Sequence, residues 1–201
     1  MLRVGLTGGL ATGKSHVGAY LEQMGCHVLK ADELGHKAIE PGGGAFDGVV
    51  RAFGPGILDE SGMIDRRTLG AVVFEDPEKL ALLNSLVHPV VIRAEELWYA
   101  GVAQRYPGGI GVVEAAILIE TGSYKRFDKI ILTVCEREQQ IARAMKRDRL
   151  SRKEVELRLS RQMPLEEKRK FADFVVDTSG DKTATLIEAR RVYEQLRRDN
   201  R

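Results

Sequence analysis

The stretch TGGLATGKS, residues 7–15, joins three glycines to a lysine and a hydroxyl residue just behind a short apolar run. Gly8 to Ser15 fit the pattern G-x-x-x-x-G-K-[ST], in which backbone N–H groups surround phosphate oxygens. Side chains at Gly8 or Gly13 would obstruct those groups, and the positive end of the following helix attracts anions. The pattern predicts that this loop holds a nucleoside triphosphate, with Lys14 at the β- and γ-phosphates and Ser15 ligating Mg²⁺.

A carboxylate at Asp32 has the chemistry of a general base. It lies at the end of the second predicted strand, and ligands of open α/β sheets bind beyond the carboxyl ends of the strands. There it can accept the proton of an acceptor hydroxyl that attacks the γ-phosphorus. Asp32 fits equally well as the N-cap of a helix that begins near Glu33.

Basic residues crowd the segment 140–162, where two helices are predicted. Cations over the migrating phosphoryl group stabilise its transition state, and one arginine there is worth about 10³–10⁵ in rate. A helical pair on a mobile arm can supply such a group while it excludes water. A solvated helix face explains most of these charges equally well. They are Arg143, Lys146, Arg147, Arg149, Arg152, Lys153, Arg158 and Arg161.

Short apolar runs alternate with helical patterns, which is typical of a parallel sheet covered on both faces. The long gap between the second and third strands predicts an inserted helical lobe, with Pro89 as a kink or break in its longest helix. Glycine-rich punctuation at 41–44 and 107–109 suits hinges near the edges of this lobe. The expected strands are 3–7, 27–31, 110–116, 129–134 and 174–177, and the expected helices are 16–24, 77–99, 137–149, 152–163 and 183–198.

Composition narrows the class of protein further. The 201 residues carry a formal net charge of +2, which gives no reason to expect nucleic-acid binding. Cys26 and Cys135 lie far apart without metal-ligand spacing, and we expect two reduced thiols. We also expect a soluble cytoplasmic protein, because no signal peptide or membrane span is evident. The D-x-x-G match at 59–62 lacks a downstream N-K-x-D motif, so we interpret it as a turn rather than a GTPase switch.

Further motifs give the chain a family resemblance over nearly its whole length. The segment D-R-x-x-L at 65–69 is followed by His88-Pro89, and R-Q-M-P stands at 161–164. With the glycine-rich loop and Ala31-Asp32, these residues resemble those of the dephospho-coenzyme A kinases. The resemblance implies an enzyme that uses ATP to phosphorylate the ribose 3′-hydroxyl of dephospho-coenzyme A, the last step of coenzyme A synthesis. Its oligomeric state is not readable from the residues.

The resemblance also implies a fold: an α/β, P-loop nucleoside-triphosphate hydrolase-like parallel five-stranded sheet with an inserted helical substrate lobe and a helical lid. We expect one kinase domain over 1–201. Its core would span about 1–35, 108–136 and 170–201, its substrate lobe about 36–107 and its lid about 140–165.

Site residues carry over from the resemblance one by one. Asp32 becomes the catalytic base and acceptor contact, Arg147 the lid arginine for the transferring phosphate, and Arg143 its second candidate at the nucleotide. Arg66 and His88 fall in the substrate lobe, although a packing role for His88 is equally open. Glu120 is a substrate candidate after the third strand, and Glu114 either holds a water on Mg²⁺ or is a plain strand-end carboxylate. The implied ATP cradle is Gly8, Gly9, Leu10, Ala11, Thr12, Gly13, Lys14 and Ser15.

Three positions depart from the family pattern. Lys30 replaces an aspartate two residues before Asp32, where a shared strand face would favour the ionised carboxylate. Ala116 replaces a proline, and Thr178 replaces an asparagine near the last strand, which questions a contact to adenine. Two alternatives stay open: a kinase for another nucleotide or small alcohol, and a nucleotide-sensing module that has lost its chemistry.

Overall fold

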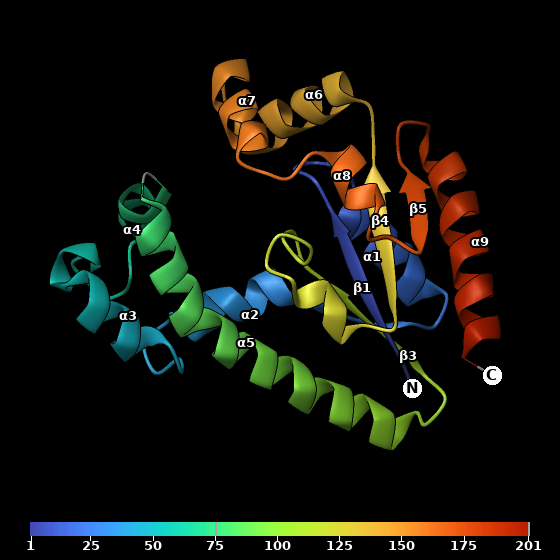
Figure 1. The fold of residues 1–201 in the computed structure, drawn as a ribbon, viewed down its shortest axis with the longest axis horizontal. Coiled ribbons are helices and arrows are strands. Elements are labelled where there is room, and N and C mark those ends of the chain that lie inside the picture. The colour runs from blue at the N-terminus through green and yellow to red at the C-terminus, as the bar shows by residue number, and fades with distance from the viewer. Residues whose placement is uncertain (75, 201) are drawn as a thin grey trace. The chain divides into compact units, whose positions relative to one another are not determined.

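A computed structural model describes residues 1–74 and 76–200 of the chain (Figure 1). It divides into two compact units, Met1–Lys30 with Gly101–Arg201, and Ala31–Ala100. The strands are β1 (Leu2–Gly8), β2 (His27–Lys30), β3 (Ile110–Glu114), β4 (Lys129–Val134) and β5 (Phe174–Asp177). The helices are α1 (Lys14–Gln23), α2 (Ala31–Ala38), α3 (Phe46–Phe53), α4 (Arg66–Phe74), α5 (Pro77–Arg105), α6 (Arg137–Asp148), α7 (Arg152–Ser160), α8 (Leu165–Arg169) and α9 (Lys182–Asp199), with short 3₁₀ turns η1 (Pro55–Ile57) and η2 (Ser123–Arg126).

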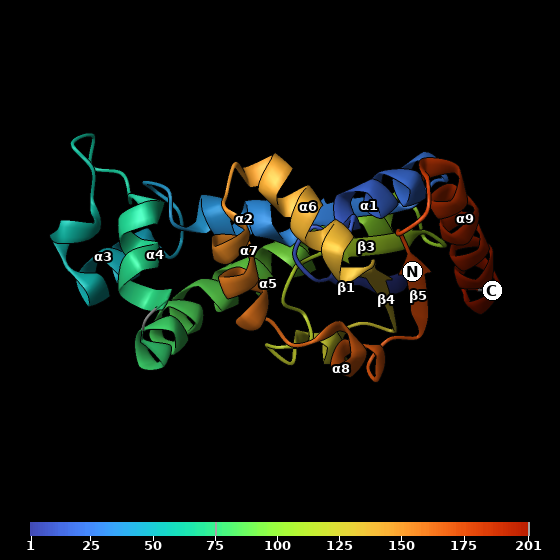
Figure 2. The same cartoon turned by 90° about the horizontal axis from the view of Figure 1, so that it is seen from above.

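The first unit is built on a five-stranded parallel sheet in the order β2-β3-β1-β4-β5. Its central strand β1 is almost wholly buried, which explains why its sequence is continuously apolar rather than alternating. Helices α1 and α9 pack together on one face, and α8 lies on the opposite face (Figure 2). Because β1 is the central strand, the loop that follows it lies at the middle of the edge formed by the carboxyl ends of the strands.

Helices α6 and α7 follow β4 and lie beyond this carboxyl edge (Figure 1). They pack on each other through Ile141, Ala144 and Val155, and Leu10 and Ala11 of the glycine-rich loop join the same apolar cluster. A capping box fixes the start of α7, in which Ser151 and Glu154 exchange hydrogen bonds. The predicted lid helices therefore share a small core with the predicted nucleotide loop.

The second unit is helical and has an apolar core of its own. Val49 of α3, Ile57 of η1 and Leu69 of α4 are buried in it, and side chains of α5 pack against them. Here α5 runs continuously through Pro89, so of the expected kink or break the break is absent. Packing of Val87 and Val90 on this core offsets the hydrogen bond that the proline removes.

The strand that precedes Asp32 is shorter than predicted. β2 ends at Lys30, and α2 begins at the next residue. Asp32 and Glu33 therefore occupy the first turn of α2. Acidic side chains stabilise a helix there, because the N-terminus is the positive end of the helix dipole. Asp32 is neither the last residue of a strand nor the residue before the helix.

None of the helices that the structure describes has the length and apolar character of a membrane span.

Candidate active site

The glycine-rich loop joins β1 to α1 in a shape that only glycine allows at two positions. A Cβ on Gly8 would overlap the side chains of Thr133 and Thr12 and would stand 2.8 Å from the Thr133 carbonyl. Gly13 precedes α1 with φ of +82°, a left-handed conformation that disfavours other residues. The first N–H groups of a helix lack intrahelical partners, and Lys14 and Ser15 stand in the first turn of α1. The result is a backbone cradle suited to an anion.

Glu114 meets the same loop from the end of β3. Ser15 Oγ donates a 2.5 Å hydrogen bond to Glu114 Oε1. The Glu114 side chain is buried, and its Oε2 has no hydrogen-bond partner in the described part of the chain. An unsatisfied buried carboxylate oxygen beside a hydroxyl suits a hydrated divalent cation. The structure thus brings together the two predicted Mg²⁺ residues.

Thr178 connects the glycine-rich loop to α6, a role that the sequence did not reveal. Its buried hydroxyl donates to the Thr12 carbonyl over 3.0 Å. Arg143 donates to the hydroxyl over 3.1 Å and to the Thr178 carbonyl over 2.8 Å. The departure at Thr178 therefore has a structural function, because its side chain, directly after β5, contacts both α6 and the glycine-rich loop.

A second contact to the glycine-rich loop comes from Gln162, which lies between α7 and α8. Its Oε1 accepts a 2.8 Å hydrogen bond from the backbone N–H of Leu10. Within the loop itself, Lys14 Nζ donates to the Gly9 carbonyl over 3.5 Å. The sequence places Gln162 in the R-Q-M-P motif but does not indicate what the side chain does.

Arg147 lies near the end of α6 and is paired with the next residue of the same helix. Its Nε and Nη2 donate to the two carboxylate oxygens of Asp148 over 2.7 and 3.0 Å. These hydrogen bonds lower the pKa of Asp148 and raise the pKa of Arg147. The Arg147 side chain is 60% exposed, so the pair lies at a solvent-accessible position.

Glu120 is held by a buried lysine. Lys168 of α8 is fully buried, and its Nζ lies 2.6 Å from Glu120 Oε1 and 3.4 Å from the Ala116 carbonyl. The Thr7 hydroxyl donates to the same carbonyl over 3.3 Å. The turn after β3, whose course the missing proline had put in question, is thus fixed by Lys168, which the sequence reading left without a function.

Three predicted site residues belong to the helical unit. Asp32 is exposed in α2, Arg66 is exposed at the start of α4, and His88 is half-buried within α5. Burial lowers the pKa of His88, which therefore favours the neutral form. Arg66 lies 3.8 Å from Glu40 in an exposed ion pair.

The two cysteines take no part in this chemistry. Cys26 and Cys135 are both buried and unpaired. Burial raises the pKa of both thiols, that of Cys26 to about 12. Neither is a thiolate at neutral pH, so neither is a nucleophile.

Comparison with known proteins decides between the kinds of P-loop protein that this geometry allows. A model of the dephospho-CoA kinase family matches residues 2–183. The chain belongs to this family. A dephospho-CoA kinase of Aquifex aeolicus is 40% identical over 199 residues, which span 99% of this chain and 100% of the relative.

Solved structures agree in fold. A crystal structure from Thermus thermophilus aligns with a TM-score of 0.86 and 34% identity, covering 97% of each chain. The dephospho-CoA kinase of Campylobacter jejuni aligns with a TM-score of 0.70 and 26% identity over 99% of this chain and 98% of that one. The predicted family and the P-loop kinase fold are confirmed.

Proposed function

We propose that this protein transfers the γ-phosphoryl group of ATP to the ribose 3′-hydroxyl of dephospho-coenzyme A. The products are coenzyme A and ADP, in the last step of coenzyme A biosynthesis. The observation that carries the proposal is the Gly8–Ser15 cradle in a chain that belongs to the dephospho-CoA kinase family. We assign the acceptor to the helical lobe 36–107 and the lid to 140–165.

The loop supplies the electrostatic part of the reaction. Backbone N–H groups and Lys14 offset the charge of the β- and γ-phosphates, and Ser15 with Glu114 would hold a hydrated Mg²⁺. When bound, Mg²⁺ neutralises phosphate charge as it develops. Arg143 is fixed on Thr178 beside the loop, which suits a contact to the nucleotide.

Asp32 supplies the proton acceptor. The 3′-oxygen forms the new bond to the γ-phosphorus while the bond to the β,γ-bridging oxygen breaks, and the hydroxyl proton passes to the Asp32 carboxylate. ADP leaves with the electron pair of the broken bond. Arg66, His88 and Glu120 are assigned to acceptor binding, and Glu120 reaches that role already oriented by Lys168.

Arg147 completes the site by exchanging partners. In the structure the Arg147 guanidinium binds both oxygens of the Asp148 carboxylate. A guanidinium binds a phosphate with the same bidentate geometry. Transfer of the guanidinium from Asp148 to the γ-phosphate would place a cation where charge accumulates in the transition state. We also propose a cytoplasmic location, in keeping with two unpaired thiols.

The decisive experiment supplies the purified protein with Mg²⁺, ATP and either dephospho-coenzyme A or a panel of nucleoside monophosphates and small alcohols. Phosphorus NMR and mass spectrometry locate the new phosphate. We expect product only from dephospho-coenzyme A, with the phosphate at the 3′-position. ATP consumption with a nucleoside monophosphate alone would favour another kinase, and ATP binding without turnover would favour a nucleotide sensor.

A further inference from the structure

Ala11 adopts a left-handed backbone conformation inside the glycine-rich loop, with φ of +56°. The N–H of Thr12 donates to the Gly9 carbonyl over 3.3 Å, so Ala11 is the third residue of a tight turn. A positive φ at this position of a turn favours glycine. An alanine there is strained, and such strain persists only where the surrounding structure enforces it.

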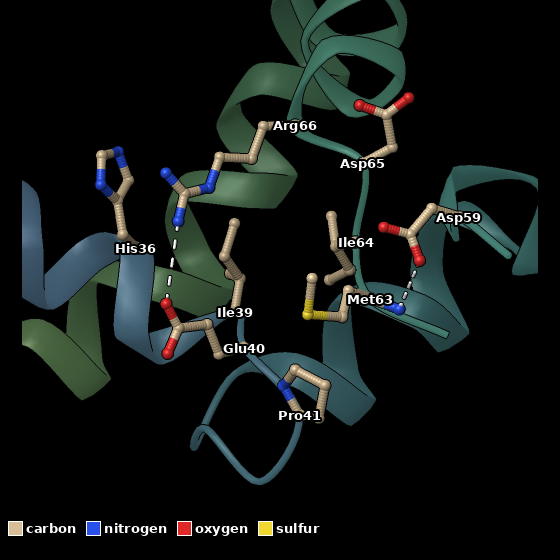
Figure 3. Close-up of a pocket in the computed structure, with 9 residues that line it drawn as sticks. All are labelled: His36, Ile39, Glu40, Pro41, Asp59, Met63, Ile64, Asp65 and Arg66. Atoms are coloured by element: carbon tan, nitrogen blue, oxygen red, sulfur yellow. Dashed lines mark hydrogen bonds and ion pairs between the residues drawn. The ribbon is translucent and has the colours of Figure 1, made fainter. Parts of the chain in front are cut away.

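Among the residues that the structure describes, only Ala11 and Arg149 are non-glycine residues with a positive φ. Arg149 ends α6, a place where left-handed residues are common. The turn before α4 shows the usual arrangement within a loop. Its left-handed residue is Gly62, and the Asp59 carboxylate fixes the turn by accepting the Met63 N–H over 3.0 Å (Figure 3). A strained alanine in a binding loop is thus an exception within this part of the chain.

Two hydrogen bonds from distant residues hold the turn on either side of Ala11. On one side, the Leu10 N–H donates to Gln162 Oε1 over 2.8 Å, across 152 positions of sequence. On the other side, the Thr178 hydroxyl donates to the Thr12 carbonyl over 3.0 Å. The backbone groups before and after Ala11 are therefore fixed by residues outside the loop.

Apolar packing does not orient the peptide groups of this turn. Leu10 and Ala11 pack against the apolar cluster of α6 and α7, but such contacts have no preferred direction. The hydrogen bond to Gln162 does have one, and it fixes the direction of the Leu10 N–H. Without Gln162 this partly buried donor would lose its partner, and a rearrangement of the loop would become favourable.

The conformation of Ala11 matters for anion binding. Ala11 and Gly13 are both left-handed, and Thr12 between them is not. Such alternation turns successive backbone N–H groups toward one concavity, which binds anions. If Ala11 relaxed to a negative φ, its N–H would leave the arrangement that surrounds the phosphate oxygens.

We infer that Gln162 is a positioning residue for ATP: through the Leu10 N–H it holds Ala11 in the left-handed conformation that the phosphate cradle requires. The inference rests on the proposed function and extends it to a residue outside the glycine-rich loop. Gln162 acts through the backbone of the loop, so it needs no contact with the nucleotide.

The test is calorimetry of a non-hydrolysable ATP analogue with Mg²⁺, which needs no acceptor. Gln162→Met keeps the length of the side chain but removes the acceptor of the Leu10 N–H. Its affinity for the analogue should fall about 5- to 100-fold, the range that corresponds to one strained residue. Gln162→Ala removes the same acceptor and replaces Gln162→Met if methionine prevents folding. Gln195→Ala is the matched control, because Gln195 is a half-buried glutamine that donates to Asp199 within α9.

Ala11→Gly separates positioning from general damage to the fold. Glycine adopts the left-handed conformation without a steric cost, so Ala11→Gly should restore most of the affinity that Gln162→Met loses. It should give no comparable gain in the wild-type background. In steady-state kinetics, Gln162→Met should raise the KM for ATP and leave the KM for dephospho-coenzyme A within twofold.

Three results would overturn the inference while the proposed function stands. They are an affinity for the ATP analogue that neither Gln162→Met nor Gln162→Ala changes, the absence of any gain from Ala11→Gly in the Gln162→Met background, and an equal rise of both KM values. Failure of the wild-type protein to bind the ATP analogue would refute both the inference and the proposed function.

Discussion

Ser15 Oγ and Glu114 Oε1 are joined by a 2.5 Å hydrogen bond that links the start of α1 to the end of β3. The second carboxylate oxygen of Glu114 is buried and lacks a partner among the described residues. Under the proposed function, this hydroxyl and this carboxylate would hold a hydrated Mg²⁺, and their hydrogen bond would orient both groups before the cation binds.

Glu114→Gln should weaken the apparent affinity for Mg²⁺ about 10- to 100-fold, because the amide keeps the shape but loses the negative charge. Calorimetry measures the affinity for the ATP analogue at increasing Mg²⁺ concentrations, and the midpoint of this dependence gives the apparent affinity for Mg²⁺. Glu136→Gln, an exposed change after β4, is the control. An unchanged Mg²⁺ midpoint in Glu114→Gln would make Glu114 a purely structural strand-end residue.

Asp32→Asn should lower kcat about 10²- to 10⁴-fold, since the amide cannot accept the proton of the attacking hydroxyl. Binding of the ATP analogue should not change. Glu33→Gln alters the other acidic residue in the first turn of α2 and controls for the helix dipole. Comparable turnover in Asp32→Asn and wild type would remove Asp32 from the mechanism.

Arg147→Ala should depress kcat by about 10³-fold and leave the KM for the acceptor nearly unchanged, because its phosphate contact forms mainly in the transition state. Steady-state kinetics separate the two parameters. Lys146→Ala removes a neighbouring exposed cation from the same helix and should have little effect. A loss confined to KM would instead place Arg147 on the bound substrate.

Thr178→Val should reduce the free energy of unfolding by about 1–3 kcal/mol, because the Thr12 carbonyl and Arg143 each lose a buried partner. Thermal or urea unfolding measures this change. Thr178→Ser keeps the hydroxyl and should recover most of the stability. If valine and serine were equivalent in stability, the hydroxyl would not connect the glycine-rich loop and α6 as the contacts indicate.

Lys168→Met should destabilise the protein by about 3 kcal/mol, because it removes the fully buried cation that pairs with Glu120, whose side chain is 21% exposed. The double variant with Glu120→Gln should be more stable than Lys168→Met alone. Lys170→Met is the comparison, since Lys170 is an exposed lysine paired with Glu167. Urea unfolding of Lys168→Met, of Glu120→Gln and of the double variant measures the coupling, and additive effects would argue against it.

The sequence was most informative where chemistry dictates residue type. The Gly8–Ser15 pattern demanded a strand before it and a helix after it, and the structure has β1 and α1 there. The family and the fold class were predictable from the motifs and are confirmed. The roles of the individual site residues remain predictions.

The sequence could not reveal roles that depend on contacts between residues far apart in the chain. The functions of Thr178 and Lys168 depend on partners more than forty positions away, such as Thr12 and Glu120. Propensity could not reveal that α5 passes through Pro89, since packing on the lobe core overrides the local cost. The start of α2 was misplaced because Asp32 suits a strand end, a cap and a first helical turn alike.

The apolar cluster that unites Leu10 and Ala11 with Ile141 and Val155 has an evolutionary consequence. A substitution in the apolar face of α6 or α7 can shift Leu10 and Ala11, and so change the shape of the glycine-rich loop, without contacting the nucleotide itself. The two segments are therefore expected to covary among homologues, and replacing α6 and α7 by those of a relative without the matching loop residues should give a poorly packed protein.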